Sequence, residues 1–154
     1  MTDKPAQPLF TNIVVGTDGT EHGTKAVTAA IELAATNPDA KLHIVMAFHP
    51  LSTRELAAVS AELPEEYRSI LHSRYPAEST LGEARRLTEA HDVDATFHEV
   101  DDDPTDAILG LVADVGADLV VVGTRGLGPA GRVMHGSVST KLLHNTPCSL
   151  LVVV

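Results

Sequence analysis

The chain is poor in aromatic residues, cysteine and positive charge. Of its 154 residues only 3% are aromatic, none is tryptophan, and Cys148 is the single cysteine. One cysteine cannot form an internal disulfide, which agrees with a reducing compartment. Lys and Arg number 11 against 21 Asp and Glu, for a net charge of −10, and no basic run occurs. Nucleic acid and anionic membranes need a cationic footprint, so we expect neither as a partner.

Long apolar segments are also missing. The run Leu150–Val154 is far shorter than the ~18 residues of a membrane span, and Met1–Phe10 has no signal-peptide pattern. We therefore expect a cytoplasmic protein. The 44% hydrophobic content is mostly Ala, Val, Leu and Ile, as buried strands use. The length fits one domain, which we place at residues 11–154 behind a flexible N-terminal tail, 1–10.

Apolar runs alternate with segments of helical periodicity. The short apolar runs predict five strands, at 13–18, 41–48, 94–100, 118–122 and 150–154. The periodic segments predict helices at 21–35, 79–90 and 137–144, and one that starts at Pro104 with Asp103 as its cap. We interpret the polar segment 51–76, which holds Pro64 and Pro76, as a loop with a helical piece.

This alternation predicts the fold class: an α/β domain with an open, mainly parallel five-stranded sheet and helices on both faces. We expect the Rossmann-like strand order 3-2-1-4-5, with the half-polar strand 94–100 at one edge. Ligands bind in such sheets beyond the carboxyl ends of the strands, near the switch in strand order. Asp18 and Gly123 follow strands one and four, so both are expected at that position.

Two glycine patterns overlap after strand four. Gly126, Gly128 and Gly131 spell G-x-G-x-x-G, but a dinucleotide site needs a helix on those glycines and an acidic residue about 20 positions later. Pro129 lies where that helix should run, and no Asp or Glu follows Gly131. A lysine-bearing phosphate loop is absent as well. The sequence therefore does not predict a dinucleotide site.

The second pattern is Gly123-x2-Gly126-x9-Gly136-Ser137. Glycines let backbone N–H groups approach an anion. A serine at a helix start adds a hydroxyl to the free N–H groups and positive dipole end of that helix. The spacing predicts a phosphate cradle that needs no lysine, although the glycines could also serve only as tight turns.

Three motifs together resemble the universal stress protein family. They are the glycine pattern after an apolar strand, Val15-Gly-Thr-Asp-Gly19 near the start, and Pro147-Cys-x-Leu-Leu-Val-Val near the end. They occur in the family's order and span Asn12 to Val154. One departure is Asp102-Asp103-Pro104, where the family usually has Gly-Asp-Pro.

The resemblance implies an ATP site, with Mg²⁺ as the counter-ion of ATP. It places the ribose at Asp18 and Thr17, and the adenine at the backbone of Ala47. Ribose and phosphate contacts are implied for Val122, Gly123 and Gly126, and phosphate contacts for Gly136, Ser137 and Val138. Asp18 could instead only cap the first helix. Asp101–Asp103 is interpreted as a solvated loop, and no metal-binding residues are predicted.

The resulting functional hypothesis is an ATP-binding regulatory protein of the stress response, with an unidentified regulatory partner. The alternatives are a slow ATPase or phosphotransferase and a cyclic-nucleotide-binding member of the family. No catalytic residue is predicted, because Ser137 has no obvious partner base in the sequence.

The last strand also predicts a homodimer. Leu150–Val154 is wholly apolar, and in the expected order it forms an open edge. Two copies pairing about a two-fold axis would close that edge, and family members often dimerise in this way. The alternative is that segment 51–76 covers the edge.

Overall fold

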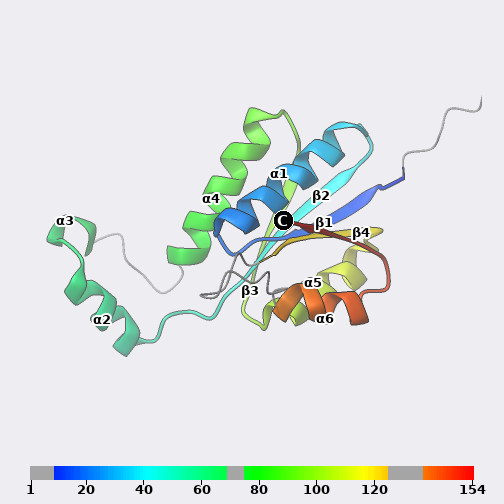
Figure 1. Ribbon diagram of the computed structural model, residues 1–154. Coiled ribbons are helices and arrows are strands. Elements are labelled where there is room, and N and C mark those ends of the chain that lie inside the picture. The colour runs from blue at the N-terminus through cyan, green and yellow to red at the C-terminus, as the bar shows by residue number, and fades with distance from the viewer. Residues whose placement is uncertain (1–8, 69–74, 125–136) are drawn as a thin grey trace, which may run out of the picture.

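The computed structural model describes residues 9–68, 75–124 and 137–154, which form one five-stranded sheet with helices on both faces (Figure 1). All strand pairs are parallel, and the order is β3-β2-β1-β4-β5. The predicted fold class and strand order are therefore confirmed. The strands are β1 (Asn12–Gly16), β2 (Lys41–Ala47), β3 (Ala95–Val100), β4 (Leu119–Gly123) and β5 (Ser149–Val153).

The burial of each strand follows its place in the sheet. The central strands β1 and β4 carry unbroken apolar runs because both of their faces are covered. Among the described strands, β3 and β5 pair on one side only, and their side chains are half-buried or exposed. The half-polar β3 is an edge strand, as its composition predicted.

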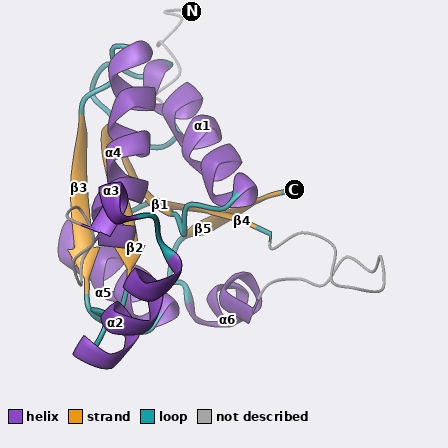
Figure 2. Cartoon of the chain, turned by 90° about the vertical axis from the view of Figure 1, so that its left-hand side faces the viewer, coloured by secondary structure: helices purple, strands orange, loops and turns teal. Residues whose placement is uncertain are grey.

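In the part of the chain that the structure describes, two helices cover each face of the sheet (Figure 2). α1 (Glu21–Ala35) and α4 (Tyr75–Ala90) pack on one face with Ile13, Val15 and Ile44. α5 (Pro104–Val115) and α6 (Ser137–Asn145) pack on the other with residues that include Val14 and Val120. The core thus has two layers, separated by the sheet.

Local sequence sets the helix ends. α5 begins as predicted, with Asp103 accepting a hydrogen bond from Thr105 N at 3.0 Å and Pro104 in the first turn. It ends at Gly116, whose φ of 63° is left-handed. α4 begins at Tyr75, earlier than the predicted 79, because a proline such as Pro76 is tolerated in a first helical turn.

The segment after β2 is more helical than predicted. It holds α2 (Thr53–Glu62) and α3 (Glu65–Arg68), neither of which has a buried residue. The missed signal is a capping box, in which Ser52 Oγ accepts from Glu55 N while the Glu55 carboxylate accepts from Ser52 N. In Figure 1, α2 and α3 stand apart from β5, so they do not cover that edge.

Asp118 joins the amino ends of β1 and β4. Its carboxylate accepts hydrogen bonds from Thr11 N at 2.8 Å, Thr11 Oγ1 at 2.7 Å and Asn12 N at 3.0 Å. Burial alone would raise the pKa of Asp118, but these hydrogen bonds outweigh it and the pKa is lowered. The ionised form of Asp118 therefore stabilises this end of the sheet.

In the described ranges, no helix is long and apolar enough to cross a membrane.

Candidate functional site

A cleft lies beyond the carboxyl ends of β1 and β4, where the strand order reverses. Its volume is about 630 Å³, counting space open to solvent. The strand ends line it with Gly16, Thr17, Asp18, Val45, Ala47, Val122, Gly123 and Thr124. The helices add Thr20, His22 and Gly23 from the start of α1, Pro104 and Ile108 from α5, and Val138 and Ser139 from α6.

The first turns of α1, α5 and α6 thus meet at one cleft. A first turn leaves backbone N–H groups without helical partners and carries the positive end of the helix dipole. The positive ends of the α1 and α6 dipoles favour a negatively charged ligand, whereas the first turn of α5 is already capped by the Asp103 carboxylate. The apolar lining from Val45, Ile108 and Val122 suits a flat, uncharged part of the same ligand.

Asp18 belongs to the structure that starts α1. Its Oδ1 accepts from Thr20 N at 3.0 Å and from Thr20 Oγ1 at 2.6 Å. Thr20 is the N-cap, and its Oγ1 accepts from Gly23 N at 3.3 Å. Asp18 therefore orients the cap and also lines the cleft, so a capping role and a ligand role are compatible.

Two glycines allow α1 to lie close against the strand ends. A Cβ atom on Gly23 would lie 2.8 Å from Asp18 Oδ1 and 2.9 Å from Thr17 Oγ1. A Cβ atom on Gly123 would overlap with the backbone carbonyl of His22. A side chain at Gly123 would push the first turn of α1 away from the cleft, and a side chain at Gly23 would displace the Asp18 and Thr17 side chains.

The structure brings most of the predicted site residues together. Thr17, Asp18, Ala47, Val122, Gly123 and Val138 all line the cleft. Ser137 is the first residue of α6. Gly126 and Gly136 lie outside the described residues. Within the described part of the chain, no group of three His, Cys, Asp or Glu side chains is arranged to hold a metal ion.

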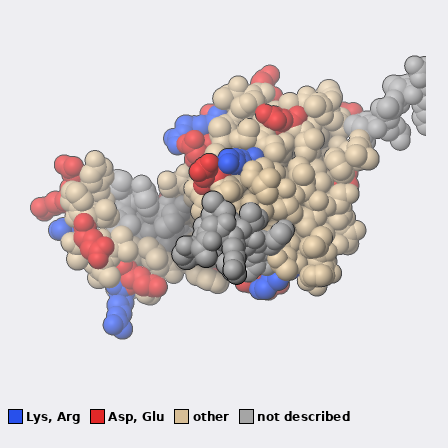
Figure 3. All heavy atoms as spheres, in the orientation of Figure 1, with Lys and Arg blue, Asp and Glu red and all other residues tan. Residues whose placement is uncertain are grey.

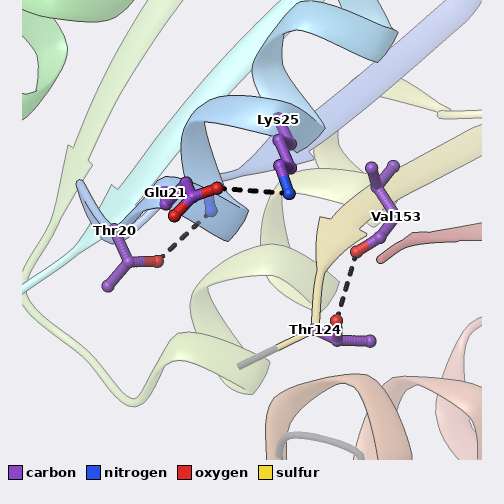
Figure 4. Close-up of polar contacts among 6 residues, drawn as sticks. Thr20, Glu21, Lys25, Thr124 and Val153 are labelled. Carbon is purple, nitrogen blue, oxygen red and sulfur yellow. Dashed lines mark hydrogen bonds and ion pairs between the residues drawn. The ribbon is translucent and has the colours of Figure 1, made fainter. Parts of the chain in front are cut away.

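Sequence reasoning missed several residues of the cleft, among them His22 and Thr124. Thr124 is buried, and its backbone N donates to Val153 O at 2.8 Å, which ties the exit of β4 to β5. Its Oγ1 lies 3.4 Å from the same oxygen (Figure 4). A signal for His22 was available, because it falls in the first turn of the predicted helix after the Val15–Gly19 motif. That position faces the carboxyl ends of the strands.

A histidine pair joins β2 to β3 outside the cleft. His43 Nδ1 lies 3.2 Å from His98 Nε2, and the ring centroids are 5.4 Å apart. Burial lowers the pKa of His98. Burial also lowers the pKa of His43, and the charges of His98 and Lys41 lower it further. Both rings therefore favour the neutral form, in which one donates to the other.

The fold, the cleft and the order of the motifs agree with a comparison against family sequence models. The model of the universal stress protein family matches residues 9–154. The chain belongs to the universal stress protein family. The predicted family resemblance is confirmed.

Relatives in the family match the domain over nearly its whole length. The chain is 32% identical over 147 residues to a universal stress protein of Thermus aquaticus, covering 94% of this chain and 99% of the relative. It is similar to a universal stress protein solved in complex with cAMP, with 30% identity, a TM-score of 0.69 and coverage of 95% and 98%. A universal stress protein of Archaeoglobus fulgidus in complex with dAMP shares the fold, with 17% identity, a TM-score of 0.65 and coverage of 95% and 99%.

Proposed function

We propose that this universal stress protein binds an adenine nucleotide in the cleft, with ATP as the expected ligand, and acts as a regulatory protein in the stress response. The observation that carries the proposal is the meeting of three helix first turns with the carboxyl ends of β1 and β4. That arrangement supplies N–H donors and dipole ends for phosphates beside an apolar lining for a base. Nucleotide occupancy would change which partner the protein binds.

Each part of the ligand has a proposed place. The ribose lies against Asp18 and Thr17, and the adenine edge meets the backbone of Ala47, the last residue of β2. The ribose and phosphates pass Val122, Gly123 and Gly126, and the phosphate oxygens meet Gly136, Ser137 and Val138. Mg²⁺ enters as the counter-ion of ATP, held by the phosphates rather than by protein carboxylates.

Cyclic AMP is the second candidate ligand. The universal stress protein that was solved with cAMP is 30% identical to this chain over nearly the whole domain. ATP and cAMP differ in the number of phosphates, so the two ligands depend differently on the glycine pattern.

Isothermal titration calorimetry with ATP and Mg²⁺, AMP and cAMP tests the proposal. We expect one adenine nucleotide site per chain and no binding of GTP, because the base contacts at Ala47 would not fit guanine. Gly126→Asp should abolish the binding of ATP by placing a carboxylate against its phosphates.

The matched control is Gly110→Asp. Gly110 is exposed on α5, and a Cβ atom there would meet nothing within 4 Å. We expect this variant to bind as the wild type does. An unchanged ATP affinity in Gly126→Asp would contradict the proposed phosphate site, and a wild-type chain that binds none of the three nucleotides would contradict the function.

A further inference from the structure

His22 lines the cleft without belonging to the motifs that predicted it. It is the second residue of α1, between the N-cap Thr20 and the tightly packed Gly23. Its backbone carbonyl lies so close to Gly123 that a Cβ atom on Gly123 would not fit between them. The position of the imidazole at the cleft is therefore fixed by the start of α1.

The two ring nitrogens of His22 differ in their surroundings. Nδ1 is closed off from solvent and has no hydrogen-bond partner. Nε2 also has no partner among the described residues, but it is not one of the buried atoms that lack a partner. A neutral imidazole carries one proton, and buried N–H groups without an acceptor are rare in proteins. The proton therefore belongs on Nε2, which makes that atom a donor.

The neighbouring side chains of the first turn are already engaged with each other. Thr20 accepts from Gly23 N, and Glu21 forms an ion pair with Lys25 at 3.3 Å (Figure 4). Neither group contacts the His22 ring, and the described residues supply no acceptor for it, so a ligand in the cleft can provide one. Close to a helix N-terminus, a negatively charged acceptor is favoured.

We propose that His22 Nε2–H donates a hydrogen bond to a phosphate oxygen of the bound nucleotide. This inference rests on the proposed nucleotide site and adds a ligand-binding residue from α1 to the glycine pattern after β4. His22 is a binding residue with no part in bond making or breaking. It makes the site selective for phosphorylated ligands over the nucleoside, because adenosine offers no charged acceptor.

The test is calorimetry of the full chain with AMP, ATP and adenosine, using three substitutions of His22. His22→Phe keeps the ring volume and removes both nitrogens. In His22→Gln the amide nitrogen takes the approximate place of Nε2, and in His22→Asn it takes the place of Nδ1. We expect His22→Phe and His22→Asn to weaken AMP and ATP binding about tenfold or more, since hydrogen bonds to charged acceptors are the strong ones. His22→Gln should stay within about threefold of the wild type, and adenosine binding should change little in all three.

Long-range ¹H–¹⁵N NMR of the wild-type chain reads the tautomer directly. We expect the proton on Nε2 in the free protein and a shift of that signal when AMP is added. Thermal melts show whether each variant is folded, and His22→Asn compared with His22→Gln carries the test if His22→Phe is not folded.

The outcomes separate this inference from the function on which it rests. If the wild type binds AMP and His22→Phe binds it equally well, the inference is wrong and the function stands. An equal loss of AMP and adenosine in His22→Phe would mean that the ring only supports the cleft, which also overturns the inference. If the wild type binds no nucleotide, the proposed function fails and the inference fails with it.

Discussion

Gly123 at the end of β4 lies directly against the backbone carbonyl of His22 in the first turn of α1. The two residues are 101 positions apart. Their contact sets the distance between the strand that leads into the glycine pattern and the helix that starts at the cleft. The crowding atoms belong to the backbone of His22, so they cannot move aside as the end of a flexible side chain would.

We expect Gly123→Ala to destabilise the fold by about 2 kcal/mol or more, as overpacking of a rigid contact does. Urea unfolding followed by circular dichroism measures this. Gly110→Ala is the control, because a methyl group there meets nothing within 4 Å and alanine is the better helix former. A Gly123→Ala variant as stable as Gly110→Ala would show that α1 can shift away from β4 without loss.

Asp118 predicts a loss of stability in acid. Its pKa is lowered in the folded chain. The contribution of Asp118 to the free energy of unfolding is therefore fully present above its pKa in the unfolded chain, near 3.9, and is lost as the pH falls through its pKa in the folded chain. We expect Asp118→Asn to be less stable than the wild type at pH 7, by roughly 1–2 kcal/mol, and the difference to shrink toward pH 2.

The control for Asp118 is Asp114→Asn, since Asp114 is exposed on α5. Its unfolding free energy should follow that of the wild type from pH 7 to pH 2. If Asp118→Asn has the same pH dependence as the wild type, the three hydrogen bonds from Thr11 and Asn12 do not hold the two strands together in solution.

The His43–His98 pair predicts a second pH effect in a milder range. Both pKa values are lowered in the folded chain. Below the unperturbed histidine pKa of about 6.5, the unfolded chain therefore binds more protons than the folded chain. The contribution of the pair to the free energy of unfolding is therefore fully present above about pH 6.5 and is lost as the pH falls through the lowered pKa values of the folded chain. We expect His98→Gln to reduce the slope of unfolding free energy against pH between 7 and 5.

His144→Gln is the matched control for the histidine pair, because His144 is exposed on α6. It should leave the slope unchanged. NMR titration of the wild type gives the two pKa values directly, and values at or above 6.5 for both rings would contradict the prediction.

The free edge of β5 predicts a homodimer. β5 pairs only with β4 among the described strands, and Leu151 on β5 and Val154 directly after it are exposed. Few charged side chains lie over this region in Figure 3, and α2 and α3 do not reach it (Figure 1). We expect multi-angle light scattering to give twice the monomer mass of 16.3 kDa, and Leu151→Lys to halve it by placing a charge at the pairing edge.

The control for the edge is Val59→Lys. Val59 on α2 is 40% exposed and Leu151 is 37% exposed, so the two substitutions change similar surfaces. Val59→Lys should keep the dimer. A halved mass in Val59→Lys alone would place the interface on α2, and a wild-type mass of 16.3 kDa would exclude a stable dimer at the concentration used.

The sequence alone determined the sheet, its strand order and the position of the cleft, because local patterns mark the strands and the motifs that follow them. Unbroken apolar runs mark β1 and β4 as central strands, and Asp103-Pro104 marks the start of α5. The motifs after β1 and β4 meet because parallel strands with right-handed crossovers bring their carboxyl ends to one edge.

Tertiary structure decided what depends on pairs of residues far apart in the chain. The sequence shows Gly123 and His22, but only the packing of α1 on β4 shows that the backbone carbonyl of His22 leaves no room for a side chain at position 123. Asp118 reads as the polar first residue of a strand until the folded sheet brings Thr11 and Asn12 to its carboxylate. His43 and His98 become a pair only through the register of β2 and β3. Such contacts follow from the distances between packed elements, and no local pattern of residues encodes those distances.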